Sequence, residues 1–441
     1  MAELIAKEAN KAFSILKTLS GQERSDALVK IHDGLKVNKD SILKANELDM
    51  KSASENNLPA SLIKRLDLSK VGKFDAMLQG VLDVANLADP VGQCTLAREL
   101  DEGLKLYRIT SPIGVLLIIF ESRPEVIANI TALAIKSGNC AILKGGKESY
   151  ETFKVMSDIV NRTLKEETAV PDAAVQLIQS REEVSGLLSQ DKYIDLVIPR
   201  GSNALVRNIK SNTKIPVLGH ADGICSIYVD SEADISKAAR ILVDSKTNYP
   251  AGCNAVEQLL IHEDIVKDSQ KIHTLLKSLI DSKVYLHVTR EIKDKVADLD
   301  QSFISDVEDD SFDKEYLSFD ISVASSSSVE SAIKHINEHS SKHTDCIVTE
   351  NKETAEKFLQ GIDSAGVYWN CSTRFADGFR YGFGTEVGIS TNKIHARGPV
   401  GLEGLMSYHY RMIGDGHVVG DYIGGGGQKA FAHKDIEVNH I

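Results

Sequence analysis

The chain has 441 residues, enough for two or three domains of roughly 150 residues each, with cores that need no disulfide or metal staple. Its 51 lysines and arginines against 63 aspartates and glutamates give a net charge of −12, which argues against a nucleic-acid-binding surface. The longest apolar run, 113–120, is too short to cross a bilayer. We therefore expect neither nucleic acid nor a membrane as a partner.

The six cysteines follow no metal-binding or disulfide pattern. They form no C-x-x-C pair and have no regular spacing. The N-terminal residues 1–4 lack the basic-then-apolar order of a signal peptide. These features predict no metal, a reducing compartment and a cytoplasmic location.

Residues 1 to about 100 place apolar side chains at helical spacing, as in Ala9, Ala12 and Leu16, and predict a helical region. From about residue 103 short apolar runs alternate with amphipathic stretches. The runs predict strands at 115–120, 140–143, 175–177 and 194–198, and the stretches predict helices at 124–137, 148–164, 181–189 and 203–210. This alternation predicts a mostly parallel sheet with helices on both faces.

A second alternating series follows. It predicts strands at 226–229, 256–261 and 284–288, with helices at 234–247 and up to about residue 280. Two such series in succession predict an α/β fold with two doubly wound domains. Three polar stretches are predicted to be solvated connections or linkers, at 306–315, 325–328 and 424–427.

The run Lys144-Gly145-Gly146-Lys147 follows a predicted strand and precedes a predicted helix. Backbone N–H groups at a helix N-terminus, with two lysines beside them, suit a phosphate. A tight turn with solvated lysines explains the same residues equally well, so both interpretations stay open at this point. The G-x-G-x-x-G fingerprint of a dinucleotide-binding unit is absent after a strand.

Cys253 lies on a Gly- and Pro-containing loop, 248–254, between a predicted helix and a predicted strand. Such a loop exposes a nucleophile, which makes Cys253 a candidate catalytic residue. A buried structural cysteine is the commoner fate of any one cysteine and is the alternative here.

Several motifs resemble the aldehyde dehydrogenase superfamily and, within it, the γ-glutamyl phosphate reductases, in a fungal-like form. They occur in order along the chain: Glu121-Ser122-Arg123-Pro124, Lys144-Gly145-Gly146-Lys147-Glu148, His220-Ala221-Asp222-Gly223, Tyr249-Pro250-Ala251-Gly252-Cys253-Asn254 and His395-Ala396-Arg397-Gly398-Pro399-Val400-Gly401-Leu402. The resemblance covers essentially the whole chain.

The resemblance implies the second step of proline biosynthesis from glutamate, the NADPH-dependent reduction of L-glutamyl 5-phosphate to L-glutamate 5-semialdehyde and phosphate. Cys253 would attack the acyl phosphate and form a thioester. Ser122 and Arg123 stand near the position where relatives place an oxyanion donor, so Arg123 is expected to bind the oxyanion or the phosphate. A structural ion pair of Arg123 with Glu121 or Glu125 is the alternative.

The resemblance also implies binding residues. Arg397 is expected to bind phosphate through its guanidinium, and Asn370 and Arg374 to face the substrate, although a scaffold role for that segment is equally compatible. The cofactor NADP(H) would be held by Lys144, Lys147, Gly201, Ser202 and Glu315. A lysine at position 147, where NAD-using relatives commonly carry a glutamate, would pair with the 2′-phosphate of NADP.

The implied architecture is aldehyde dehydrogenase-like, with a cofactor-binding domain at 1–228, a catalytic domain at 229–370, and residues 371–441 returning to the cofactor domain and a small oligomerisation element. A homo-oligomer is expected, with possible functional coupling to glutamate 5-kinase.

Two other functions remain to be weighed. One is a hydrolytic aldehyde dehydrogenase, which needs a base to activate water; no carboxylate occurs at 215–221, where such enzymes carry a glutamate, although His220 is a rival base. The other is a non-catalytic scaffold, against which the intact 249–254 loop argues.

Overall fold

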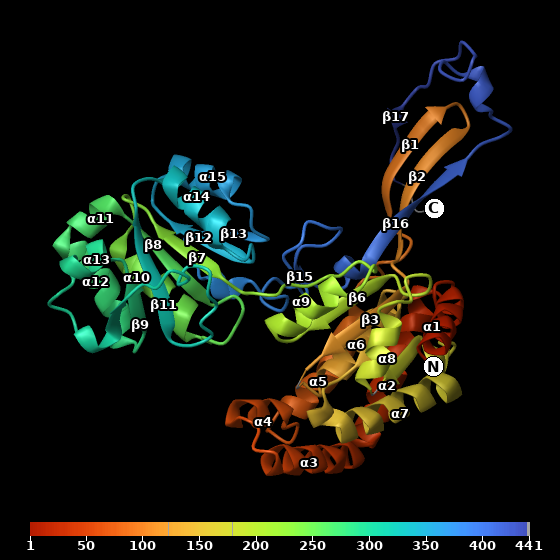
Figure 1. The fold of residues 1–441 in the computed structure, drawn as a ribbon. Coiled ribbons are helices and arrows are strands. Elements are labelled where there is room, and N and C mark those ends of the chain that lie inside the picture. Colours follow the sequence, from red (N-terminus) through yellow and green to blue (C-terminus); the bar gives the residue numbers. More distant parts are fainter. Residues whose placement is uncertain (122, 179, 439–441) are drawn as a thin grey trace.

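The computed structural model describes residues 1–121, 123–178 and 180–438. Figure 1 shows two α/β bodies and an arm that projects away from both. The first body comprises strands β3–β6 with helices α1–α9, the second body comprises β7–β13 with α10–α15, and the arm comprises β1, β2, β16 and β17. Within the described ranges, no helix has the length and apolarity needed to cross a membrane.

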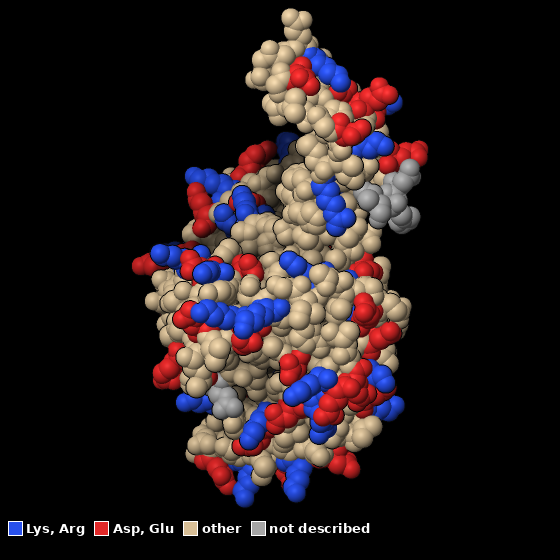
Figure 2. All heavy atoms as spheres, turned by 90° about the vertical axis from the view of Figure 1, so that its right-hand side faces the viewer, with Lys and Arg blue, Asp and Glu red and all other residues tan. Residues whose placement is uncertain are grey.

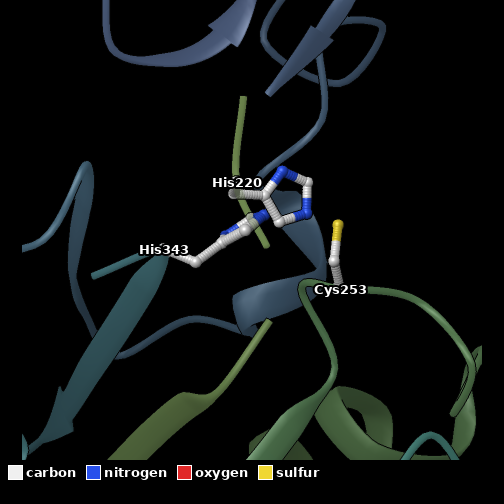
Figure 3. Close-up of side chains that lie close together, drawn as sticks. All are labelled: His220, Cys253 and His343. Carbon is white, nitrogen blue, oxygen red and sulfur yellow. The ribbon is translucent and has the colours of Figure 1, made fainter. Parts of the chain in front are cut away.

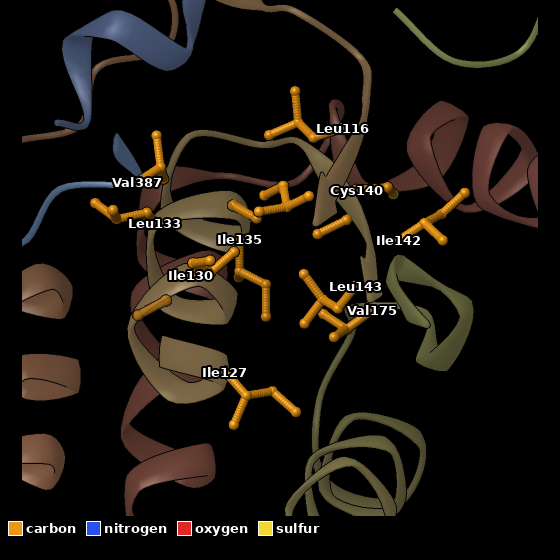
Figure 4. Packing of buried hydrophobic residues seen from close by; sticks show 14 of the residues in the cluster. Leu116, Ile127, Ile130, Leu133, Ile135, Cys140, Ile142, Leu143, Val175 and Val387 are labelled. Carbon is orange, nitrogen blue, oxygen red and sulfur yellow. The ribbon is translucent and has the colours of Figure 1, made fainter. Parts of the chain in front are cut away.

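The first body is built on a parallel sheet of order β5-β4-β3-β6. Every residue of its central strand β3 is buried, as expected for a strand covered on both faces. Figure 4 shows apolar side chains of α6 packed beside those of the sheet. The strands are β3 (Val115–Phe120), β4 (Cys140–Lys144), β5 (Val175–Ile178) and β6 (Leu196–Arg200).

Nine helices among the described residues surround this sheet. They are α1 (Ala2–Leu16), α2 (Gly21–Val37), α3 (Lys39–Glu55), α4 (Ala60–Leu66), α5 (Lys73–Asn86), α6 (Val126–Lys136), α7 (Tyr150–Glu167), α8 (Arg181–Leu187) and α9 (Asn203–Ser211). Two of them, α2 and α8, begin with capping boxes, Ser20 with Glu23 and Ser180 with Glu183, in which serine and glutamate satisfy each other's backbone N–H groups.

The second body is built on a seven-stranded parallel sheet of order β10-β9-β11-β8-β7-β12-β13. Its strands are β7 (Cys225–Val229), β8 (Val256–His262), β9 (Tyr285–Val288), β10 (Ile304–Asp306), β11 (Asp320–Ser326), β12 (Thr344–Val348) and β13 (Gly366–Trp369). Its helices are α10 (Ile235–Thr247), α11 (Glu263–Lys267), α12 (Ser269–Asp281), α13 (Arg290–Lys295), α14 (Val329–His339) and α15 (Lys352–Gly361).

After β13 the chain returns to the first body, where β14 (Gly388–Ser390) pairs with β15 (Gly398–Val400), and it then enters the arm. The arm is an antiparallel sheet of order β16-β2-β1-β17. Seven of the eight residues of β16 are exposed, including several apolar ones. Its strands are β1 (Cys94–Asp101), β2 (Leu104–Pro112), β16 (Met406–Ile413) and β17 (Lys434–Asp435).

The structure confirms the α/β fold with two parallel-sheet bodies, and each strand and helix predicted from 115 to 288 is present within a few residues. The helical region ends earlier than predicted, because β1 begins at Cys94. The predicted boundary at 228 cuts through β7, which already belongs to the second sheet from Cys225 onward.

Two of the predicted connections differ in the structure. The serine run 325–328 is no solvated connection: Ser325 and Ser326 end β11, and Ser328 caps α14 by accepting the Ser331 N–H. The glycines at 424–427 form a hydrogen-bonded turn inside the arm and do not link domains, since the Gly427 N–H donates to the Tyr422 carbonyl. The acidic stretch is exposed at 308–310, as predicted, whereas residue 315 at its end is partly buried.

Candidate active site

The thiol of Cys253 lies on the loop between α10 and β8, at the amino edge of the second sheet. Two short hydrogen-bonded turns shape the loop: the Gly252 N–H donates to the Tyr249 carbonyl at 3.0 Å, and the Ala255 N–H donates to the Gly252 carbonyl at 2.9 Å. Gly223 passes so close that a Cβ there would lie 2.3 Å from the Cys253 carbonyl oxygen. Cys253 remains partly exposed.

Two histidines flank the thiol (Figure 3). The Cys253 sulfur and one ring nitrogen each of His220 and His343 all lie within 4.8 Å of one another. His220 comes from the connection between α9 and β7, and His343 immediately precedes β12. The two rings meet edge to face, with centroids 5.2 Å apart. Three segments far apart in the sequence therefore converge on one sulfur atom.

The protonation of His220 follows from its partners. Its Nδ1 lies 3.1 Å from the Ile389 carbonyl oxygen, which can only accept a hydrogen bond, so Nδ1 carries the proton. Burial lowers the pKa of His220, and it lowers the pKa of His343 well below its usual value. A neutral His220 ring leaves a lone pair on Nε2.

Charged side chains surround the sulfur. Burial, followed by the nearby carboxylates of Glu386 and Glu315, raises the pKa of Cys253 to about 12, while Arg200 and Arg374 oppose the rise. Arg200 in turn donates to the Glu386 carbonyl oxygen at 3.4 Å. The thiol of the free protein is therefore protonated at neutral pH, and it needs both a proton acceptor and nearby positive charge to react.

Arg374 lies over the Cys253 loop. Its guanidinium sits 5.6 Å from the centroid of the Tyr249 ring, and its Nη1 approaches Gly252 so closely that a Cβ there would lie 2.7 Å away. The Tyr249 hydroxyl accepts a hydrogen bond from Arg65 of α4 at 2.7 Å, which joins this loop to the first body. Arg374 is thus placed to meet a negative group brought to the thiol.

Three comparisons with known proteins bear on this site. A model of the aldehyde dehydrogenase family matches residues 1–284. The chain is 59% identical to the gamma-glutamyl phosphate reductase of Saccharomyces cerevisiae, covering 100% of this chain and 99% of that protein. It is 52% identical to a probable gamma-glutamyl phosphate reductase of Schizosaccharomyces pombe, covering 99% and 97%.

The chain belongs to the aldehyde dehydrogenase family. Within that family its relatives place it in the gamma-glutamyl phosphate reductase branch, and it is an oxidoreductase of that branch. The crystal structure of gamma-glutamyl phosphate reductase from Thermotoga maritima matches with a TM-score of 0.90 at 36% identity, over 95% of this chain and 99% of that one. An acetylating aldehyde dehydrogenase from Geobacillus thermoglucosidasius, 16% identical with a TM-score of 0.63, shares the fold.

In this aldehyde dehydrogenase Lys144 and Lys147 line one cavity of about 230 Å³ at the carboxyl edge of the first sheet, together with Tyr150 and Phe153. Lys144 is buried and donates to the Gly145 carbonyl oxygen, whereas Lys147 is exposed. Gly145 is required here, because a Cβ would lie 1.9 Å from the Phe153 ring. The turn is therefore tight and also has a cavity beside its two lysines. The interpretation as a tight turn and the interpretation as a phosphate-binding turn are thus compatible.

Gly201 and Ser202 precede α9, as predicted for pyrophosphate binding, but a carboxylate already occupies that helix N-terminus. The Ser202 N–H donates to Glu121 Oε2 at 3.1 Å, and a Cβ on Gly201 would lie 2.6 Å from the same oxygen. A phosphate could reach these N–H groups only after Glu121 turns away.

The remaining predicted residues lie at different distances from the thiol. Glu315 lies close enough to Cys253 to raise its pKa, and its Oε1 accepts the Gly223 N–H at 2.9 Å. Arg397 donates to the Asp363 carbonyl oxygen at 2.8 Å. Lys342, next to His343, pairs with the Asp363 carboxylate at 3.1 Å, which connects Arg397 to the histidine segment.

Among the predicted site residues, Asn370 lies away from the Cys253 thiol. Its amide exchanges two hydrogen bonds with the backbone of Thr349, at 3.0 and 2.9 Å, at the carboxyl ends of β12 and β13. His343 is at the opposite end of β12, and five strand residues span about 16 Å. Asn370 therefore holds the carboxyl end of the sheet, at the opposite edge from the Cys253 thiol.

Sequence reasoning missed Arg200, Glu386 and His343. The sequence did contain a signal for Arg200. Arg200 ends β6, and Arg123 follows β3, which is the neighbouring strand of the same parallel sheet. Burial, followed by the nearby and exposed Arg123, lowers the pKa of Arg200. His343 sits in a Ser- and Lys-rich stretch that looked like ordinary surface. Ser122, the other predicted oxyanion candidate, lies outside the described residues.

Proposed function

We propose that the chain reduces L-glutamyl 5-phosphate to L-glutamate 5-semialdehyde with NADPH, releasing phosphate, as the second step of proline synthesis from glutamate. The carrying observation is the partly exposed Cys253 thiol, set beside a neutral histidine and between two arginines. The names of the fungal relatives support the same reaction.

Acyl transfer begins at the thiol. Because its pKa is raised to about 12, Cys253 must give up its proton as it attacks. His220 would accept this proton, since one of its ring nitrogens lies within 4.8 Å of the sulfur and its Nε2 carries a free lone pair. The sulfur forms a bond to the acyl carbon, the bond from that carbon to the phosphate oxygen breaks, and the departing phosphate takes the proton from His220. The product on the enzyme is a thioester.

Positive charge from both bodies serves this step. Arg200 and Arg374 act on Cys253 directly, and Arg123 stands beside Arg200. Guanidinium groups bind phosphate and carboxylate oxygens in pairs, so these arginines can hold the leaving phosphate and the substrate's α-carboxylate. Arg397 is tied to Asp363 and contributes less to phosphate binding unless that pairing loosens.

The residues around Lys144 fit a phosphorylated cofactor. They form a hollow with one buried and one exposed lysine, and Gly145 allows close packing against Phe153. Lys147 would pair with the 2′-phosphate of NADPH, and Glu315, beside the thiol, would accept a ribose hydroxyl. NADPH, when bound, supplies the hydride that reduces the thioester, after which the Cys253 sulfur leaves and the aldehyde is released.

A hydrolytic aldehyde dehydrogenase is the second candidate, and the structure gives it one supporting observation. The sequence shows no carboxylate at 215–221, yet Glu315 and Glu386 lie near Cys253 from elsewhere in the chain. Each accepts one backbone N–H, from Gly223 and Gly378 respectively, and burial raises the pKa of both. Either could activate water if the site admits it.

The arm supports a homo-oligomer. Tyr408, Tyr410, Met412 and Ile413 of β16 are 53–60% exposed, and Figure 2 shows the arm projecting from the body with both acidic and basic side chains on its surface. An exposed strand of this kind gains stability by pairing with another chain. We propose self-association through the arm, a cytoplasmic location, and functional coupling to glutamate 5-kinase, whose product would be the substrate.

The reverse reaction tests the proposal. Purified protein receives glutamate semialdehyde and NADP⁺, with or without phosphate, and NADPH and free glutamate are measured. The proposal predicts steady NADPH formation only with phosphate and little free glutamate. A comparable steady rate without phosphate, with glutamate as product, would assign the chain to the hydrolytic alternative.

A further inference from the structure

We propose that His220, Cys253 and His343 bind a single Zn²⁺ ion, which reversibly blocks the thiol. Two imidazole nitrogens and one sulfur lie within 4.8 Å of one another, and among the described residues they form the one such group of three metal-ligating side chains. Proteins bind Zn²⁺ mainly through nitrogen and thiolate sulfur, whereas Mg²⁺ and Ca²⁺ prefer oxygen ligands.

The geometry requires only a small adjustment. With Zn–N of about 2.0–2.1 Å and Zn–S of about 2.3 Å, tetrahedral ligand atoms lie about 3.3–3.6 Å apart. From their limit of 4.8 Å, the three atoms would therefore approach one another by at most about 1.5 Å. The residues come from three separate connections around the site, and Figure 3 shows their side chains converging. Water would fill the fourth position, as it does in three-ligand zinc sites.

A second observation points to a ligand independently of the distances. His343 is only 1% exposed, and its Nε2 is buried without a hydrogen-bond partner, although Nδ1 lies 2.9 Å from the Thr344 hydroxyl. Buried polar atoms normally have partners, and a metal ion would provide one. On the other side, the His220 Nδ1 bond to the Ile389 carbonyl is the supporting contact that orients metal-binding histidines.

Charge and proton balance are consistent with a divalent ion. Binding breaks the S–H bond of Cys253, forms a Zn–S bond and releases one proton to solvent. Glu315 and Glu386 offset the added positive charge, while Arg200 and Arg374 oppose it. The site is therefore expected to bind reversibly rather than to hold a permanent structural metal.

The consequence for activity rests on the proposed role of Cys253, because a zinc-bound thiolate cannot form the thioester. Metal binding itself does not depend on that role. The two are tested separately, by a direct binding measurement and by activity.

The binding experiment uses the full chain stripped of metal. Titration with Zn²⁺ is followed by calorimetry and by the rate at which iodoacetamide alkylates Cys253, with the modified peptide identified by mass spectrometry. We expect one Zn²⁺ per chain, alkylation slowed at least tenfold, and recovery on adding a chelator. Mg²⁺ and Ca²⁺ should give no protection. Co²⁺ should add the near-ultraviolet absorption band of a thiolate–cobalt bond.

The matched variants are His343→Gln and His335→Gln. His335 of α14 also has a buried Nε2 without a partner but lies outside the cluster. His343→Gln should weaken Zn²⁺ binding at least tenfold, and His335→Gln should leave it unchanged. If His343→Gln fails to fold, the Co²⁺ band of the unmodified chain decides the question. Absence of that band, or unchanged protection of Cys253 in folded His343→Gln, would overturn the proposal. Failure of the phosphate-dependent reaction alone would not.

Discussion

The two parallel sheets present opposite edges to the active site. The first sheet contributes its carboxyl edge, where Arg123 follows β3, Lys144 ends β4 and Arg200 ends β6. The second contributes its amino edge, where Cys253 precedes β8 and His343 precedes β12. Helices begin at a carboxyl edge and end at an amino edge, so their dipoles favour anions at the first edge and disfavour a thiolate at the second.

The position at an amino edge bears on the pKa of the Cys253 thiol. A reactive cysteine usually has a lowered pKa because it lies at a helix N-terminus or beside cations. Burial, followed by the nearby carboxylates of Glu386 and Glu315, raises the pKa of Cys253 to about 12, and the thiol lies beyond the end of α10 instead of at a helix N-terminus. Arg200, at the carboxyl edge of the first sheet, opposes this rise in the pKa of Cys253. The carboxyl edge therefore gathers cationic side chains, whereas the amino edge holds a thiol whose pKa is raised.

Removing the Cys253 thiol at the amino edge should have the largest effect on the reaction rate. Cys253→Ala should lower the rate of semialdehyde-dependent NADPH formation at least about a thousandfold, because no other group replaces the covalent step. Cys371→Ala is the control, since Cys371 is also partly exposed but follows β13 at the far edge. Circular dichroism should show unchanged folding in both. An active Cys253→Ala variant would show that the thiol at the amino edge of the second sheet is not needed for the reaction.

A buried ion pair beside the Cys253 loop should stabilise the amino edge of the second sheet. Lys246 near the end of α10 and Glu257 in β8 are both fully buried, with Nζ 2.7 Å from Oε2. Glu257→Gln leaves a buried unpaired cation and should lower the free energy of unfolding by about 3–5 kcal/mol. Asp281→Asn breaks the exposed pair with Lys277 and should cost at most about 0.5 kcal/mol.

Urea unfolding of both variants measures this contrast. Equal losses of unfolding free energy in Glu257→Gln and Asp281→Asn would mean that the buried pair does not anchor the loop.

At the carboxyl edge, changes should alter binding and leave the chemical step intact. Lys147→Glu replaces a partner of the 2′-phosphate with a repelling charge, and a charge-assisted pair is worth about 1.5–3 kcal/mol. The ratio of kcat/KM for NADPH over NADH should fall about tenfold or more. Lys154→Glu, an exposed lysine on α7, is the charge-matched control. An unchanged ratio in Lys147→Glu would show that Lys147 does not contact the phosphate.

The smallest effects are expected among the arginines. Arg123→Ala should raise the KM for phosphate about tenfold, since a charge-assisted contact is lost. Arg397→Ala should raise it less, because Asp363 already holds that guanidinium. Arg123→Lys should restore little, because a lysine lacks the forked geometry. A KM for phosphate that stays unchanged in all three variants would make both arginines structural.

The sequence predicted the four strands of the first sheet and the first three strands of the second, β7, β8 and β9, because a buried parallel strand is a continuous apolar run, as β3 illustrates from Val115 to Phe120. It did not predict β10 to β13. It did indicate Cys253 through the Pro and Gly residues of its loop. Order along the chain does not show which edges of the two sheets meet. Arg200, Glu386 and His343 therefore emerged only from the structure.

Two other differences have similar causes. Asn370 lies four residues before Arg374, but β13 ends at Trp369 and the chain then turns, so only Arg374 reaches the thiol. The helix N-terminus at Ser202 was correctly placed by pattern, yet nothing local revealed that Glu121 would occupy it. Contacts made by residues distant in sequence decide both outcomes.

In the proposed reaction, Cys253 carries the acyl group as a thioester until phosphate removes it. Rapid mixing of the protein with excess semialdehyde and NADP⁺, without phosphate, tests it directly through NADPH absorbance. The account predicts a burst of one NADPH per active chain that then nearly stops, with steady turnover resuming when phosphate is added and no burst in Cys253→Ala. Linear NADPH formation without phosphate and without a burst would contradict it.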